Sequence, residues 1–268
     1  MKVKDYVILA SLLLLAIFIW LRQKTWITSY DDTLPILIAL PLFWWLGTPW
    51  RFREDQAPLS LPKVILSVVL FLIGILTNLT IILAIAWTLL LWTWLSSRTL
   101  PETHPSIKKL LILPLMSFPW ISLDADRIGW WFRLSGAHIT AQIFALTGFN
   151  VIQEGTNLMI NNVPISVDVA CAGLNTLQSM IIAGSIVAYI FLGNSTLYWW
   201  NLPLLVVMAW IANTLRIILL SAAALIISPE FATGSFHTWG GWGVLILMFL
   251  LCWLLFSLQK NKIEKITS

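Results

Sequence analysis

Long apolar runs, separated by short polar segments, make up most of this chain. A helix needs roughly 20 predominantly apolar residues to cross the hydrocarbon core of a membrane, and most of these runs approach that length. The run from Val64 to Leu95 is too long for one span and contains Thr77–Thr80, so it predicts two helices joined by a tight turn. The pattern predicts an all-α polytopic membrane protein with about eight transmembrane helices: Tyr6–Leu21, Leu34–Trp50, Val64–Leu76, Ile81–Leu95, Leu110–Leu123, Leu174–Leu192, Leu202–Ile227 and Trp242–Leu258.

Residues 124–170 form the longest segment without a spanning run. From Arg127 to Phe149, apolar residues recur at helical spacing on one side, which predicts an amphipathic helix in the plane of the membrane interface. The polar residues of this helix are expected on its other faces: Arg133, Ser135, His138 and Gln142. Leu158–Ile160 and Val163–Val169 follow as two short strands around Asn161–Asn162, and they predict a small β-hairpin before the sixth span.

The composition supports a membrane protein and narrows its chemistry. Charged residues make up 10% of the chain, whereas soluble domains contain about 25%. The 17 tryptophans fit a protein with many membrane-interface positions. The net charge of +4 is spread over short loops and the termini, so membrane lipid is an expected partner and nucleic acid is not. The two cysteines and three histidines show no metal-ligand spacing, and neither a metal nor a cofactor is expected.

Lysine and arginine gather in alternate loops, and this bias sets the orientation because cytoplasmic loops are enriched in both. The basic residues of the predicted cytoplasmic side are Lys2, Lys4, Arg51, Arg53, Lys63, Arg98, Lys108, Lys109, Lys260, Lys262 and Lys265. The predicted outer loops carry fewer: Arg22, Lys24, Arg127 and Arg133. We therefore predict a multi-pass protein of the cytoplasmic (inner) membrane with both termini in the cytoplasm. The amphipathic helix and the hairpin then face the periplasm or exterior.

The chain is predicted to form a single integral membrane domain over residues 1–268. Its N-terminal spans occupy residues 6–123, and its candidate catalytic core occupies residues 124–258. The core contains an outer-face insertion at residues 124–170, and a cytoplasmic tail follows at residues 259–268.

Three residues of the predicted outer face have the chemistry of a nucleophilic site. Cys171 lies where an irregular segment meets the sixth span, between small residues that allow close approach to its sulfur. Arg216 falls in the outer half of the seventh span, where a charge costs a few kcal/mol, and Asn213 precedes it by one turn. His237 lies in a polar, glycine-bearing loop before the last span. A thiolate beside a cation, an oxyanion-stabilising arginine and a proton-transferring histidine would form a cysteine-dependent acyl-transfer site, with Asp168 orienting Arg216 or His237.

Each of these residues also has a structural interpretation. A cysteine in an apolar protein is commonly a small core residue, and this alternative stays open for Cys171. Arg216 alternatively pairs with Asp168 or extends to the outer interface. His237 alternatively is an ordinary loop residue. A disulfide between Cys171 and Cys252 is not indicated, because Cys252 lies inside an apolar run.

The chain resembles the exosortase/archaeosortase family in three ordered motifs. The motifs are the cysteine segment Val167–Leu174, the Asn213–Ile217 segment with Asn and Arg one turn apart, and the Phe236–Trp242 segment with its histidine and two glycines. The resemblance runs from about Asp124 to Trp242 and is closest to the cyanoexosortase branch. Members of this family are regarded as membrane transpeptidase-type proteases. They are thought to recognise exported proteins that end in a short motif such as PEP, one transmembrane helix and a basic cluster.

The resemblance implies that Cys171 is the nucleophile, Arg216 the thiolate or oxyanion stabiliser, and His237 the general acid and base. The chain departs from the family pattern at two positions: Ala172 stands where Ser is frequent, and Asn175 where a basic residue is common. A non-enzymatic membrane protein, such as a transporter or a surface-polymer assembly factor, is the alternative function. A catalytically silent relative that only binds sorting signals is a third.

Overall fold

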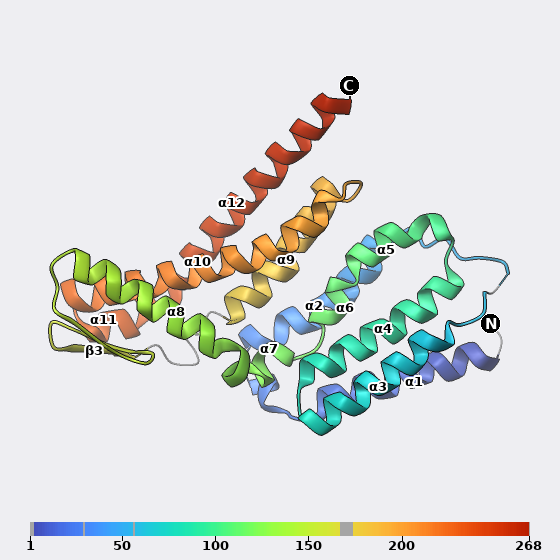
Figure 1. The fold of residues 1–268 in the computed structure, drawn as a ribbon, viewed down its shortest axis with the longest axis horizontal. Coiled ribbons are helices and arrows are strands. Elements are labelled where there is room, and N and C mark those ends of the chain that lie inside the picture. Colours follow the sequence, from blue (N-terminus) through green and yellow to red (C-terminus); the bar gives the residue numbers. More distant parts are fainter. Residues whose placement is uncertain (1–2, 29, 56, 167–173, 268) are drawn as a thin grey trace. The chain divides into compact units, whose positions relative to one another are not determined.

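The computed structural model describes residues 3–28, 30–55, 57–166 and 174–267 (Figure 1). The chain divides into two compact units, Met1–Asp124 and Ala125–Ser268. The described residues form helices throughout, with one small sheet in the second unit. The predicted helical fold class is thus confirmed in outline, and a small sheet lies where the hairpin was expected.

The first unit consists of helices. They are α1 (Val3–Leu21), η1 (Thr25–Thr28), α2 (Tyr30–Leu46), α3 (Leu61–Thr77), α4 (Thr80–Arg98), η2 (Pro101–Thr103), α5 (His104–Leu110), α6 (Ile112–Met116) and α7 (Trp120–Leu123). The predicted helical hairpin is confirmed as α3 and α4. Asn78 ends α3 in the left-handed conformation, with φ of 57°, and its amide together with that of Leu79 donates to the last carbonyls of the helix. Gly74 lets the two helices approach closely, since a Cβ there would lie 2.7 Å from a methyl carbon of Leu83.

The start of α4 is capped by a carboxylate from the other end of the unit. Asp124 Oδ1 accepts a hydrogen bond from the Thr80 amide at 3.2 Å, and Asp124 Oδ2 accepts one from the Ile81 amide at 2.9 Å. The first amides of a helix have no partner within the helix, and its amino end carries a partial positive charge. Asp124 is 4% exposed, so this buried charge is matched by the helix terminus.

The predicted fifth span is not one continuous helix. Residues 110–123 fold as the end of α5 followed by two short helices, α6 and α7. Pro119 immediately precedes α7, and a proline cannot donate the amide that would continue a helix through this point. The predicted second span also ends earlier than expected, because α2 stops at Leu46 and Trp50 lies beyond it.

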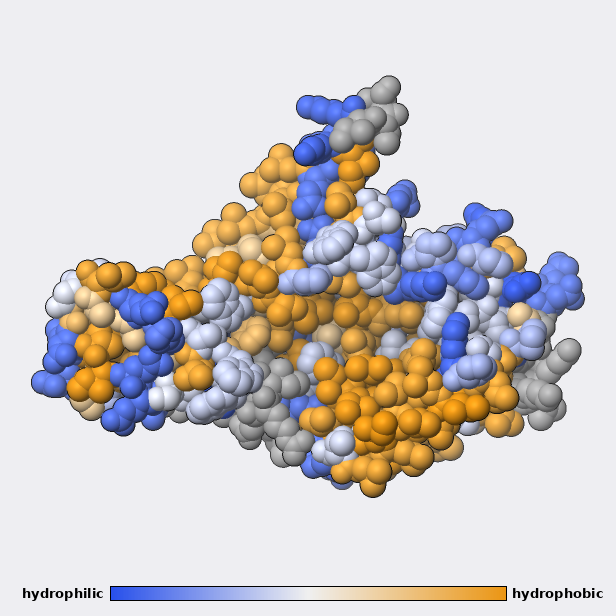
Figure 2. Space-filling model, in the orientation of Figure 1, coloured by the Kyte–Doolittle hydropathy of each residue, from blue (hydrophilic) through white to orange (hydrophobic). Residues whose placement is uncertain are grey.

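Within the described residues, three helical segments are long and apolar enough to cross a membrane: Thr80–Arg98, Leu197–Ile226 and Trp239–Lys265. Shorter apolar helices occupy Tyr6–Leu21, Thr33–Leu46, Leu61–Thr77 and Thr176–Leu192. Figure 2 shows hydrophobic residues over broad areas of the visible surface, in agreement with the exposed leucines and valines of α3 and α12. A total of about eight spans remains a prediction.

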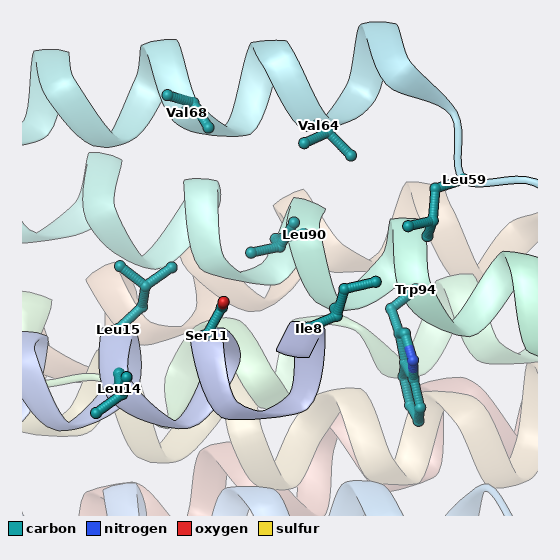
Figure 3. Close-up of a pocket in the computed structure, with 9 residues that line it drawn as sticks. All are labelled: Ile8, Ser11, Leu14, Leu15, Leu59, Val64, Val68, Leu90 and Trp94. Atoms are coloured by element: carbon teal, nitrogen blue, oxygen red, sulfur yellow. The ribbon is translucent and has the colours of Figure 1, made fainter. Parts of the chain in front are cut away.

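A cavity of about 460 Å³ lies in the first unit between α1, α3 and α4 (Figure 3). Its lining is almost entirely apolar: Ile8, Ser11, Leu14, Leu15, Leu59, Val64, Val68, Leu90 and Trp94. The Ser11 hydroxyl donates to the Val7 carbonyl of its own helix at 2.8 Å. None of the described lining residues has an ionisable side chain, and they offer no group for acid–base chemistry.

The second unit begins with α8 (Ala125–Leu146) and a three-stranded antiparallel sheet. The strands are β1 (Val151–Glu154), β2 (Asn157–Ile160) and β3 (Val163–Ser166), in the order β1-β2-β3. A helix and a hairpin are therefore present where both were predicted, and Asn161 and Asn162 form the turn with φ of 47° and 66°. The end of the predicted second strand, residues 167–169, lies outside the described residues. Strand β1 was not predicted. It joins β2 through Gly155 and Thr156, and Gly155 has a φ of 62°, which is a common glycine conformation in tight turns.

Helices α9 (Leu174–Leu192), α10 (Leu197–Ile226) and α12 (Ser235–Thr267) pack against one another, and the short α11 (Pro229–Thr233) precedes α12. The sixth span is confirmed as a helix with its predicted bounds. The loop predicted at residues 228–241 is wrong, because α11 and the first two turns of α12 occupy most of it. His237 therefore belongs to a helix. Gly240 and Gly241 resembled loop residues, but both lie within α12, and the packing of Gly241 described below explains a glycine there.

Candidate active site

The register between α9 and α10 is set by a close contact. Gly184 of α9 lies against Leu205 of α10, where a Cβ on the glycine would be 2.3 Å from a leucine methyl carbon. The two helices are joined by residues 193–196 and therefore form an antiparallel pair. Positions along the two helix axes can therefore be measured from the contact between Gly184 and Leu205.

Arg216 lies at the level of the first residues of α9. From the Gly184–Leu205 contact, α9 begins ten residues away at Leu174, and Arg216 is eleven residues away on α10 in the same direction. At about 1.5 Å per residue, both distances are close to 15 Å. Arg216 therefore lies at the end of the helix pair where α9 begins. The first residue of α9, Leu174, follows Cys171 by three positions in the sequence.

Helix α12 meets α10 at Arg216. A Cβ on Gly241 would lie 3.1 Å from Nε and 3.2 Å from Cζ of Arg216, so the guanidinium rests directly on the glycine. Any larger residue at 241 would push the guanidinium away. Position 237 precedes Gly241 by four residues, or about one helical turn. The Asn213–Ile217 motif on α10 and the Phe236–Trp242 motif on α12 are thus adjacent in the structure.

Asn213 lies one turn before Arg216 on α10 and is 1% exposed. Neither its Nδ2 nor its Oδ1 has a hydrogen-bond partner in the part of the chain that the structure describes. Buried polar groups in native proteins are nearly always paired, and an unpaired one calls for an explanation such as a catalytic or binding role. Asn213 was predicted to support Arg216, and that role stays a prediction.

Helix α8 also packs against α10, which contacts α9 and α12 as well (Figure 1). The Trp210 indole donates to the Ser135 hydroxyl at 2.9 Å, and a Cβ on Gly136 would lie 2.9 Å from the Ile217 Cδ1. Further along α8, Phe144 shares a buried apolar cluster with Ile217. These contacts pack α8 against α10.

Sequence reasoning placed Arg133 on a polar face of α8, and this prediction is wrong. Arg133 is only 9% exposed and lies in register with the buried Ala137, Thr140 and Phe144. Its Cζ lies 5.7 Å from the centre of the Trp130 ring, and its Nε has no hydrogen-bond partner among the described residues. Positions 133, 137, 140 and 144 are four, three and four residues apart, which is the spacing of one helix face. This spacing indicated that Arg133 is buried, whereas its charge led to the prediction of a solvent-facing residue.

Helix α11, which leads into α12, has a defined start. The Ser228 hydroxyl accepts a hydrogen bond from the Phe231 amide at 3.1 Å, as an N-cap does. Hydrogen bonds from its own backbone amide and from the Ser228 side chain lower the pKa of Glu230. The cap therefore fixes the turn from which α12 departs toward Gly241.

The family model described as transmembrane exosortase matches residues 5–254. The chain belongs to the transmembrane exosortase family. Comparisons with curated proteins and with solved structures give no match. The matched range of this exosortase includes the cysteine, arginine and histidine motifs and extends through both units.

Two predicted site residues of the exosortase, Cys171 and Asp168, lie outside the described residues, and the side chain of His237 is likewise not described. Their roles stay predictions. Cys252, the other cysteine, is buried in α12 with a free thiol. Among the predicted residues, the described structure thus brings together Asn213, Arg216 and the helix position of His237.

Proposed function

We propose that this exosortase is a cysteine-dependent membrane protease and transpeptidase. It cleaves PEP-CTERM-like sorting signals of exported proteins at the outer side of the cytoplasmic membrane and transfers the substrate to an acceptor. Its substrates carry a C-terminal motif, one transmembrane helix and a basic tail. One observation carries the proposal: Arg216 lies against Gly241, at the level where α9 begins just after Cys171.

The proposed chemistry uses three groups. The Cys171 thiolate attacks the scissile carbonyl carbon, and Arg216 stabilises the oxyanion that forms. The C–N bond then breaks, and His237 gives its proton to the leaving nitrogen, which leaves a thioester on Cys171. A nucleophile on the acceptor, or water, attacks the thioester and passes its proton to His237. The C–S bond breaks and the thiolate is restored.

Apolar surroundings explain why this chemistry needs Arg216. A thiolate and an oxyanion are both costly at a low dielectric constant, and a fixed cation offsets part of that cost. Arg216 is only partly buried, and Gly241 leaves the space that its guanidinium occupies.

Co-expression with a signal-bearing reporter tests the proposal. Cys171→Ala is expected to reduce reporter processing by about 10³-fold or more, and Arg216→Ala by roughly 100-fold, with both variants inserted in the membrane. Cys252→Ala is the matched control, since it removes the other cysteine and is expected to leave processing intact. A thiol-reactive probe is expected to label Cys171 selectively.

Processing that persists in Cys171→Ala would overturn the proposal and return the protein to the non-enzymatic alternatives. Selective labelling of Cys171 without processing of any signal-bearing reporter would also contradict it. Absence of labelling together with reporter binding would indicate a silent member that only binds sorting signals.

A further inference from the structure

The apolar cavity of the first unit opens at the surface of that unit. Two of its lining residues, Leu14 of α1 and Val68 of α3, are 66% and 53% exposed. Helices α1 and α3 each pack against α4, and Figure 3 shows Leu90 of α4 between their side chains. The opening therefore lies between α1 and α3. In a transmembrane protein such an opening faces lipid tails, which are as apolar as leucine.

The cavity has a closed end and a length that can be measured along α1. Phe18 of α1 contacts Phe71 of α3, with ring centroids 5.8 Å apart, and this pair lies just beyond the lining residue Leu15. The lining of α1 begins at Ile8, ten residues before Phe18, or about 15 Å along the helix. Half of the hydrocarbon core of a membrane is also about 15 Å. The cavity therefore has the length of an acyl chain within one leaflet.

Trp94 contributes an unpaired hydrogen-bond donor to the lining. Its Nε1 is buried and has no partner among the residues that the structure describes. Trp87, two turns earlier on the same helix, instead donates to the Leu12 carbonyl at 2.7 Å. A buried donor without an acceptor costs free energy, and in native proteins it usually signals a partner outside the chain. The Trp94 indole thus calls for an acceptor at this end of the cavity.

The position of Trp94 along α4 indicates which acceptor a membrane supplies there. Arg98, the last residue of α4, follows Trp94 by four positions, or about 6 Å. An arginine at the end of a span extends to the membrane interface, and tryptophan prefers the level of the headgroups. The carbonyl groups of phospholipid esters lie at the boundary between headgroups and acyl chains. Trp94 is therefore at the level of an ester carbonyl, and the Phe18–Phe71 end is deeper in the hydrocarbon.

We propose that this cavity binds one acyl chain of a diester phospholipid, whose ester carbonyl accepts a hydrogen bond from Trp94 Nε1. Its volume of about 460 Å³ lies within the usual range of ligand sites, about 300–1,000 Å³. A transmembrane helix of a partner is about 10 Å wide and has its carbonyls paired internally, so it offers no acceptor to Trp94. The bound chain contacts α1, α3 and α4 together and stabilises their packing.

Competition between two phospholipids tests the hydrogen bond. The lipids have the same headgroup and chain length, but one is a diester and the other a diether, which has no carbonyl. Native mass spectrometry of the full-length protein measures how much of each is retained. The wild type is expected to retain the diester roughly 3- to 10-fold more than the diether. Trp94→Phe keeps an aromatic ring without the N–H, and it should lose this preference while retaining the diether as the wild type does.

A second variant tests the place of binding and does not depend on Trp94. Ser11 lines the cavity and its hydroxyl bonds only within its own helix among the described contacts. Ser11→Phe fills space that the chain would occupy and should reduce retention of both lipids by roughly 10-fold or more. Leu13→Phe is the matched control, because Leu13 is 59% exposed on the same helix and does not line the cavity. Trp45→Phe removes an indole from an exposed position of α2 and should leave the diester preference unchanged.

Four results would overturn the lipid site. Equal retention of diester and diether by the wild type would show that Trp94 makes no bond to an ester. An equal loss of both lipids in Trp94→Phe would assign the effect to ring packing. Unchanged retention in Ser11→Phe would place the lipid elsewhere. Cross-linking of a photoreactive residue at position 14 to a second copy or to a reporter, with none to lipid, would show that a helix occupies the opening.

Discussion

Asp124 and Asn213 are both buried polar side chains, and they are satisfied in opposite ways. Asp124, in the first unit, accepts hydrogen bonds from two amides at the start of α4. Asn213, in the second unit, pairs with no group that the structure describes. A buried group with partners contributes to stability, whereas a buried group without them costs free energy and persists for another reason. The contrast separates a buried residue that holds the fold from one whose polar atoms are unpaired among the described residues.

The largest effect is expected from removing the carboxylate of the first unit. Asp124→Ala leaves the Thr80 and Ile81 amides without acceptors, and it should lower the free energy of unfolding by roughly 2–4 kcal/mol. Hydrogen exchange at these two amides measures the change directly. Asp124→Asn keeps one acceptor oxygen and should lose less. Unchanged exchange in Asp124→Ala would show that the cap contributes nothing.

Asn213→Ala is expected to show the reverse behaviour. Processing of a signal-bearing reporter should fall by roughly 10- to 100-fold, while the free energy of unfolding should change by less than about 1 kcal/mol because no hydrogen bond is lost. Thermal unfolding in detergent and reporter processing are measured on the same preparation. Thr214→Val is the control, since the Thr214 hydroxyl donates to the Trp210 carbonyl of its own helix. A stability loss as large as that of Asp124→Ala would remove the contrast.

A smaller effect is expected where Arg216 touches Gly241. Gly241→Ala places a methyl group about 3.1 Å from Arg216 Nε, and the resulting displacement of the guanidinium should reduce processing by roughly 3- to 10-fold. Gly243→Ala, two residues along the same helix, adds a methyl group into open space and should be neutral. Equal activities of the two variants would show that the contact does not position Arg216.

The elements predicted well from the sequence are those with a strong local signal. Helix α9 has its predicted bounds, and the α3–α4 hairpin turns at Asn78, because an apolar run and a left-handed residue each act locally. Strand β1 was missed since only four residues pair with β2. The start of α12 was missed because Gly240 and Gly241 usually favour loops. The close approach of Arg216 explains why a glycine stands at position 241 within the helix, and that reason lies on another helix.

The candidate site was predictable in its chemistry and not in its surroundings. Arg216 and Asn213 were found because a charge or an amide in an apolar run is costly and invites a functional explanation. The burial of Arg133 was not predicted, because an arginine on an amphipathic helix normally faces water. Its burial depends on the packing of α8 against α10, which no local pattern records.

Helix α12 is one long continuous helix of the second unit. Its 33 residues extend about 50 Å at 1.5 Å per residue, whereas the hydrocarbon core of a membrane is about 30 Å thick. The same helix therefore contains Gly241, which contacts Arg216, and Lys260 and Lys265 near its C-terminal end. An insertion of one residue between these points would advance the lysines by about 1.5 Å and rotate them by about 100° relative to Arg216. The length of α12 therefore fixes both the height and the direction of its basic end relative to Arg216.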